Sequence, residues 1–167
     1  MDWQIKTIAK KSAVSETPFS PGDRVLCLVY KEAGEPELGR ADLLESEAGD
    51  FRAPGEVLGR WVRVVKDPGD EGAQMKETMA SAEDFFFSLY ENEPTEPEAR
   101  EESEVLKHLL ALMLERKRIL RALPPRRSEG EQAYLHVKLK KEVAVPVVEI
   151  SPELMLKIED TIGELIL

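Results

Sequence analysis

The sequence predicts an α+β fold, and three observations support that prediction. The near-continuous apolar run from Arg24 to Lys31 is typical of a buried strand, and Leu58 to Lys66, with Trp61, Val62, Val64 and Val65 among polar residues, predicts a second strand. Two later segments, Gln74 to Tyr90 and about Glu98 to Leu123, repeat apolar residues at the three- and four-residue steps of a helix. A strand pair and a closing helix follow, so the order is a β-rich front module, a helical pair, then a hairpin and a helix.

Residues 1–70 are expected to form the β-rich front module. Its strands are a short one at Trp3, Ile5 and Thr7, the two runs named above, and a return strand from Leu38 to Leu44. The turns are indicated by Pro21-Gly22-Asp23, by Gly34-Glu35-Pro36 and by Asp67-Pro68-Gly69-Asp70, which closes the module.

The predicted helix from Gln74 to Tyr90 carries three consecutive aromatic residues. Phe85, Phe86 and Phe87 spread aromatic surface over most of the helix circumference. Such a helix is either enclosed by the rest of the fold or covered by a partner. Core packing is the favoured interpretation. The alternative is that a partner covers the helix, which makes these three residues candidate partner-binding residues.

A second predicted helix, from about Glu98 to Leu123, follows an acidic linker that contains Pro94 and Pro97. Acidic residues near its start and basic residues near its end complement the helix dipole. The stretch from Leu109 to Leu114 is apolar on every side, which predicts a buried central helix. Pro124-Pro125 is expected to stop it.

The last part of the chain is expected to form a hairpin and a helix. Tyr134 to Leu139 and Val143 to Ile150 are the strands, joined around Lys140-Lys141-Glu142, and Pro146 places the second strand at an edge or a bulge. Ser151-Pro152-Glu153 is typical of a helix start. The apolar stripe of this helix packs on the fold or forms a homodimer interface. Residues 71–167 are a second domain or part of one compact domain with residues 1–70.

The composition indicates a soluble protein of the cell interior. The chain has 167 residues, of which 42% are apolar, and a formal net charge of −10, which repels nucleic acid and anionic lipid at long range. We see neither a signal peptide nor a run of ~20 apolar residues that could span a bilayer, so no membrane partner is expected. The single cysteine, Cys27, cannot form an intrachain disulfide and is expected to be buried. These features favour the cytoplasm.

No motif commits the chain to a reaction or a cofactor. Cys27, His108 and His136 are scattered, whereas a structural zinc site needs four Cys or His ligands at paired spacing. His108 is expected at a helix surface or in the core, and His136 pointing outward from a strand. Gly-x-Ser-x-Gly, Gly-x-Gly-x-x-Gly and Gly-x-x-x-x-Gly-Lys are all missing from the sequence. We therefore predict no catalytic, cofactor-binding or metal-binding residue and favour a role other than that of an enzyme.

The charge is divided between two zones. Residues 67–104 hold thirteen acidic side chains against two basic ones, and residues 115–141 hold nine basic side chains against three acidic ones. Either the zones neutralise each other across the fold, or a basic patch faces an acidic partner. The candidate partner-binding residues of this patch are Arg116, Lys117, Arg118, Arg121, Arg126 and Arg127. They could also contact phosphates, but Tyr134 is the one nearby aromatic residue for base stacking.

Several segments together resemble an uncharacterised family of small bacterial proteins. They are an N-terminal Trp strand, Pro18-Phe19, Gly22-Asp23, Arg60-Trp61-Val62-Arg63-Val64, and the stretch from Leu110 to Leu120 that contains Ala-Leu-Met-Leu-Glu-Arg-Lys-Arg. The resemblance covers most of the chain and implies no assigned activity. Members begin with a zinc-ribbon-like cysteine knuckle, and here Ser12-Ala13-Val14-Ser15 stands where Cys-x-x-Cys would fall. The resemblance thus implies that this chain has lost that metal site.

Two functional hypotheses follow from the sequence. The first is a non-catalytic protein–protein interaction or adaptor protein whose partner is unidentified. The alternative is a nucleic-acid-associated regulatory factor that uses the basic patch on the long helix, which the acidic balance of the chain disfavours. An enzyme of unrecognised type is a third and weaker hypothesis.

Overall fold

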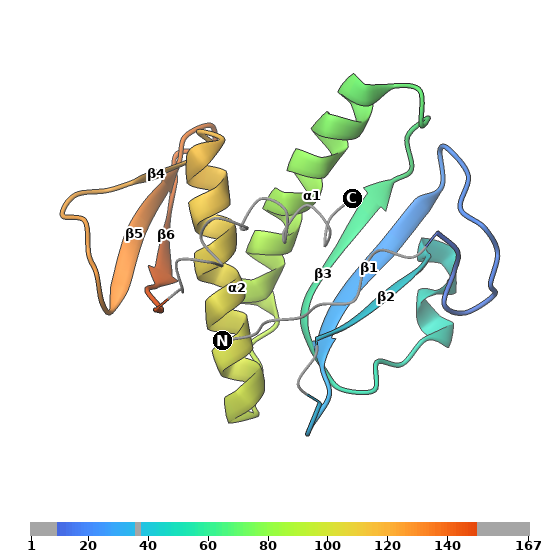
Figure 1. Cartoon of the computed structure of the whole chain (residues 1–167), viewed down its shortest axis with the longest axis horizontal. Coiled ribbons are helices and arrows are strands. Elements are labelled where there is room, and N and C mark those ends of the chain that lie inside the picture. The colour runs from blue at the N-terminus through green and yellow to red at the C-terminus, as the bar shows by residue number, and fades with distance from the viewer. Residues whose placement is uncertain (1–9, 36–37, 150–167) are drawn as a thin grey trace.

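The computed structural model describes residues 10–35 and 38–149. The predicted strand at Trp3 to Thr7, the Pro36 end of the hairpin tip, and the closing helix from Ser151 with its dimer interface lie outside the described residues. The described part has the predicted α+β fold: two helices pack between two antiparallel sheets of three strands each (Figure 1).

The first sheet has the strand order β2 (Gly39–Leu44), β1 (Arg24–Lys31), β3 (Glu56–Val64). Every residue of β1 after Arg24 is buried, as the apolar run predicted. One face packs on the helices, and the other packs on a smaller cluster that includes Leu26 and Leu28. A 3-10 helix, η1 (Glu45–Asp50), follows β2.

The first helix, α1 (Glu71–Glu91), begins three residues before its predicted start because Asp70 caps it. The Asp70 carboxylate accepts a hydrogen bond from Ala73 N at 3.0 Å. On the sheet side, the ring of Phe85 stacks on Trp61 with centroids 4.4 Å apart. The closeness of this contact depends on Gly59, where a Cβ would come within 2.7 Å of the Phe85 ring.

The second helix, α2 (Pro97–Arg116), has the buried centre that the sequence predicted. Its predicted end at Leu123 is wrong. Ile119 N donates to Leu114 O at 2.9 Å, and Arg118 N donates to Glu115 O at 3.0 Å, which is the Schellman pattern of a helix C-terminus. Arg118 holds the left-handed position with φ 63°, where glycine is usual, and for that reason the stop is hard to read in the sequence.

The second sheet has the order β4 (Leu120–Ala122), β5 (Glu131–His136), β6 (Lys141–Pro146). Strand β4 occupies the stretch predicted as the end of the helix. Strand β6 lies at an edge, as Pro146 indicated. The turn between β5 and β6 comes earlier than expected, because Lys140 N donates to His136 O at 2.7 Å and so closes the turn before residue 141.

His136 does not point outward as predicted. Its side chain is buried, because alternate residues of β5, Gln132, Tyr134 and His136, all face the core. Both ring nitrogens have a polar neighbour there. Nδ1 accepts a hydrogen bond from Leu139 N at 3.0 Å, and Nε2 lies 3.4 Å from a Glu83 carboxylate oxygen.

A single buried cluster spans both predicted units. It includes Val25 and Trp61 from the first sheet, Phe85 and Leu109 from the helices, and Tyr134 from the second sheet. Residues on the two sides of residue 70 therefore share one hydrophobic core. Within the described ranges, no helix is long and apolar enough to cross a membrane.

Candidate functional site

Burial divides the candidate residues into two groups. Phe85 and Phe86 are 0% exposed and belong to the shared core, so they are not available to a partner on the surface of this chain. Phe87 is partly buried, between α1 and the second sheet, with its ring centroid 5.8 Å from that of His136. The aromatic run serves a helix enclosed on several sides, so Phe85 and Phe86 take the core position that the sequence favoured, and the alternative that they bind a partner does not fit their burial.

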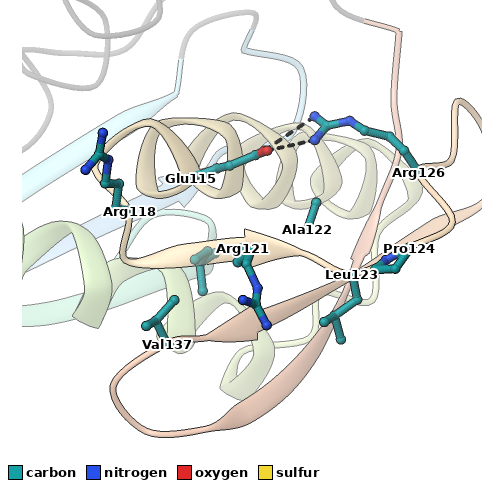
Figure 2. A pocket seen from close by; sticks show the side chains of 9 residues that line it. Glu115, Arg118, Arg121, Ala122, Leu123, Pro124, Arg126 and Val137 are labelled. Carbon is teal, nitrogen blue, oxygen red and sulfur yellow. Dashed lines mark hydrogen bonds and ion pairs between the residues drawn. The ribbon is translucent and has the colours of Figure 1, made fainter.

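Three of the predicted basic residues converge on one hollow of about 570 Å³ along β4, which we call the β4 hollow (Figure 2). Arg118 comes from the turn after α2, Arg121 from β4 itself, and Arg126 from the following loop. The lining is completed by Glu115, Leu120, Ala122, Leu123, Pro124 and Val137. The other three predicted residues, Arg116, Lys117 and Arg127, are exposed but are not part of this lining.

The local backbone explains where each of the three arginines lies. Arg118 projects from the left-handed corner that ends α2, and Arg121 lies on the outer face of β4 because its neighbour Leu120 is buried. The loop that carries Arg126 is held by the buried side chain of Gln132. Its amide donates to Leu123 O at 2.8 Å, and its carbonyl oxygen accepts from Arg127 N at 2.6 Å.

The charges of the β4 hollow differ in how they are partnered. Arg126 forms an ion pair with Glu115 at 2.7 Å, and this hydrogen bond raises the pKa of the Arg126 guanidinium. Among the described residues, no ion pair or side-chain hydrogen bond involves Arg118 or Arg121. The hollow also has an apolar component, since Val137 is 49% exposed. It therefore offers positive charge that no described residue neutralises, beside apolar surface.

The predicted alternative use of this patch, base stacking, lacks its aromatic residue. Tyr134 is 1% exposed, and its hydroxyl points to Glu115 at 3.5 Å. Burial raises the pKa of the Tyr134 phenol. A ring in that position has no face open to a nucleobase.

The three candidate metal ligands of the sequence are not brought together. The described part of the chain contains no group of three His, Cys, Asp or Glu side chains that could hold a metal ion. Cys27 is buried in β1, which confirms that prediction, and burial raises the pKa of its thiol to about 12. His108 is half-buried on α2, where Nδ1 accepts a hydrogen bond from Val148 N at 3.1 Å.

No family model, curated protein or solved structure matches this chain. The resemblance to small bacterial proteins with a zinc-ribbon-like knuckle therefore stays a prediction.

Sequence reasoning identified the arginines of the β4 hollow but missed the element that arranges them. Leu120, Arg121 and Ala122 alternate between buried, exposed and half-buried positions, the period of a strand. This signal covers only three residues and directly follows a long helical pattern, which masked it. Glu115 and Val137 were missed because the fold alone brings them to the same place.

Proposed function

We propose that this chain is a non-catalytic interaction protein that binds an acidic protein partner through the β4 hollow. The observation that carries the proposal is the convergence of Arg118, Arg121 and Arg126, from three different segments, around a hollow with exposed apolar surface. Two of these arginines have no acidic partner among the residues that the structure describes. Arginine beside apolar surface is typical of protein interfaces. The expected setting is the cytoplasm.

The test is affinity capture with the full chain from a lysate of its source cell, with and without nuclease. The double variant Arg118→Glu/Arg121→Glu reverses two charges at the hollow. The control Arg60→Glu reverses an exposed charge on β3, in the other sheet. A protein that survives nuclease, is retained by the control and is lost by the double variant supports the proposal. A protein retained by all three chains would place the interface elsewhere and overturn it.

The nucleic-acid alternative is addressed by the same experiment. Arginines at the hollow can neutralise phosphates, and such binding weakens steeply as salt rises. Co-purified nucleic acid, lost with the double variant and on nuclease treatment, would replace the protein-binding proposal. The burial of Tyr134 makes the alternative the weaker of the two.

A further inference from the structure

The outer edges of the two sheets differ in whether their main-chain groups are covered. Each edge strand presents N–H and C=O groups that can pair with another strand unless something blocks them. At β3, Ser88 Oγ accepts from Arg60 N at 3.0 Å, and a Glu77 carboxylate oxygen accepts from Val64 N at 2.8 Å. Side chains of α1 therefore occupy donors along that edge.

Two other edges are covered by different means. At β2, Ala13 N donates to Asp42 O at 2.9 Å, so the segment before β1 lies along the strand. At β6, Tyr90 Oη donates to Ala144 O at 2.7 Å, and Pro146 has no N–H to offer. These edges are thus partly closed to a further strand.

At β4, the outward main-chain groups have no partner in the described part of the chain. Ile119 O accepts from Val137 N at 3.1 Å, and Leu123 N donates to Ala133 O at 2.9 Å, so residues at odd positions bond to β5. By the alternation of an antiparallel pair, the main-chain groups of Leu120 and Ala122 then point to the outer edge. Within residues 10–35 and 38–149, no hydrogen bond uses these four groups.

The β4 hollow lies at this edge. Its lining includes the consecutive residues from Leu120 to Pro124, and Figure 2 shows Glu115 and Arg126 on one side of the strand with Arg121 and Val137 on the other. A strand added at the usual spacing of ~4.8 Å would therefore place one set of alternate side chains beside Arg121. The other set would face the Glu115–Arg126 pair.

We propose that an extended acidic segment of a partner protein adds to the free edge of β4 as a fourth strand of the second sheet. Its main chain pairs with Leu120 and Ala122, and its acidic side chains meet Arg118 and Arg121. An acidic segment is favoured because the zone from residue 115 to residue 141 has nine basic side chains against three acidic ones. This inference rests on the proposed function and adds the binding mode to it.

The test uses the full chain and a labelled short peptide of alternating glutamate and threonine, with binding followed by fluorescence anisotropy at low salt. Two N-methylated versions of the peptide are compared, each carrying methyl groups on one alternate set of amides. Strand addition predicts that one version binds like the parent and the other does not, because only one edge of the peptide faces β4. Equal binding of both versions would overturn strand addition.

Variants of the chain test strand addition independently. Ala122→Pro removes an N–H that points outward, so it leaves the β4–β5 hydrogen bonds in place and is expected to abolish peptide binding. Arg121→Glu is expected to weaken binding about tenfold, with Arg60→Glu as the unchanged control. If Ala122→Pro does not fold, the methylated peptides still test strand addition, and Arg121→Glu still tests the charge contact.

The outcomes separate this inference from the proposed function. A captured partner that is lost with Arg118→Glu/Arg121→Glu but retained by a folded Ala122→Pro variant would overturn strand addition and leave the proposed function standing. Loss with both variants supports the inference. A third outcome concerns nucleic acid. If a single-stranded oligonucleotide displaces the peptide, and the single change Arg121→Glu abolishes binding of that oligonucleotide, the inference and the proposed function are both overturned in favour of phosphate recognition.

Discussion

The hydroxyl of Ser88, on α1, lies 3.0 Å from the main-chain nitrogen of Arg60, at the outer edge of β3, and accepts its hydrogen bond. The same hydroxyl donates to Phe85 O at 2.7 Å within its own helix. One buried side chain therefore joins the helix to the sheet and occupies an edge donor that would otherwise be free.

Replacing this hydroxyl should destabilise the fold. We expect Ser88→Ala to lower the free energy of unfolding by about 1–2 kcal/mol, because the N–H of Arg60 loses its acceptor. Urea unfolding followed by circular dichroism measures the change. Ser128→Ala, on an exposed loop, is the control and should stay within about 0.5 kcal/mol of the parent chain. Equal midpoints for the two variants would contradict the role given to Ser88.

The contact between Gly59 and Phe85 leaves no room for a side chain. A Cβ at residue 59 would lie 2.7 Å from the Phe85 ring, so Gly59→Ala should cost about 1–3 kcal/mol through overpacking. Gly49→Ala is the matched control, since a Cβ there meets nothing within 4 Å. Phe85→Leu should reduce the cost of Gly59→Ala in a double-mutant cycle. Additive effects of the two changes would argue against a direct clash.

Arg118 holds a conformation that suits glycine better than arginine. Its φ is 63°, at the left-handed corner after α2. Arg118→Gly should therefore raise the free energy of unfolding by about 0.5–1 kcal/mol, and it also removes a charge from the β4 hollow. Arg116→Gly, in the last helical turn, should lower it by about 0.5–1 kcal/mol. A variant that is more stable but binds less well would separate the binding role of Arg118 from any folding defect. Loss of stability in Arg118→Gly would contradict the assignment of the helix end.

The buried imidazole of His108 makes stability depend on pH. Burial is the largest cause that lowers the pKa of His108 below its ordinary 6.5, and the nearby Arg126 charge acts in the same direction. The unfolded chain therefore binds the proton more readily, so this contribution is fully present above pH 6.5 and is lost as the pH falls below it. Urea unfolding at a series of pH values should show this decline.

The variant His108→Asn isolates that effect. An asparagine oxygen can replace Nδ1 as the acceptor for Val148 N but does not titrate. The decline in stability just below pH 6.5 should therefore be shallower in His108→Asn than in the parent chain. An unchanged slope would assign the pH dependence to other groups.

The thiol of Cys27 should be inert in the folded chain. Burial raises its pKa to about 12, and the neighbouring Asp42 carboxylate adds to the shift, so very little thiolate forms at neutral pH. A disulfide reagent that releases a coloured thiolate should react slowly with the native chain and rapidly in denaturant. Equal rates in the two conditions would show that Cys27 is accessible.

Elements with a long local signal were predicted, whereas features that depend on a single residue or on distant partners were not. The strand at β1 was predicted from its near-continuous apolar run and the helix at α1 from its apolar periodicity, and both signals extend over many residues. The end of α2 was missed because Arg118 takes the left-handed corner that a glycine would have marked. The direction of His136 was wrong because its partners, Glu83 and Leu139 N, come from a distant helix and from a turn.

Composition and local patterns were sufficient to predict the α+β class, the burial of the strand at β1, the central helix and the division of charge along the chain. Tertiary packing places Phe85 and Phe86 in the core and leaves Phe87 partly buried. It also brings Arg118, Arg121 and Arg126 together along β4. Burial and convergence depend on which surfaces pack together, and no local pattern encodes that choice.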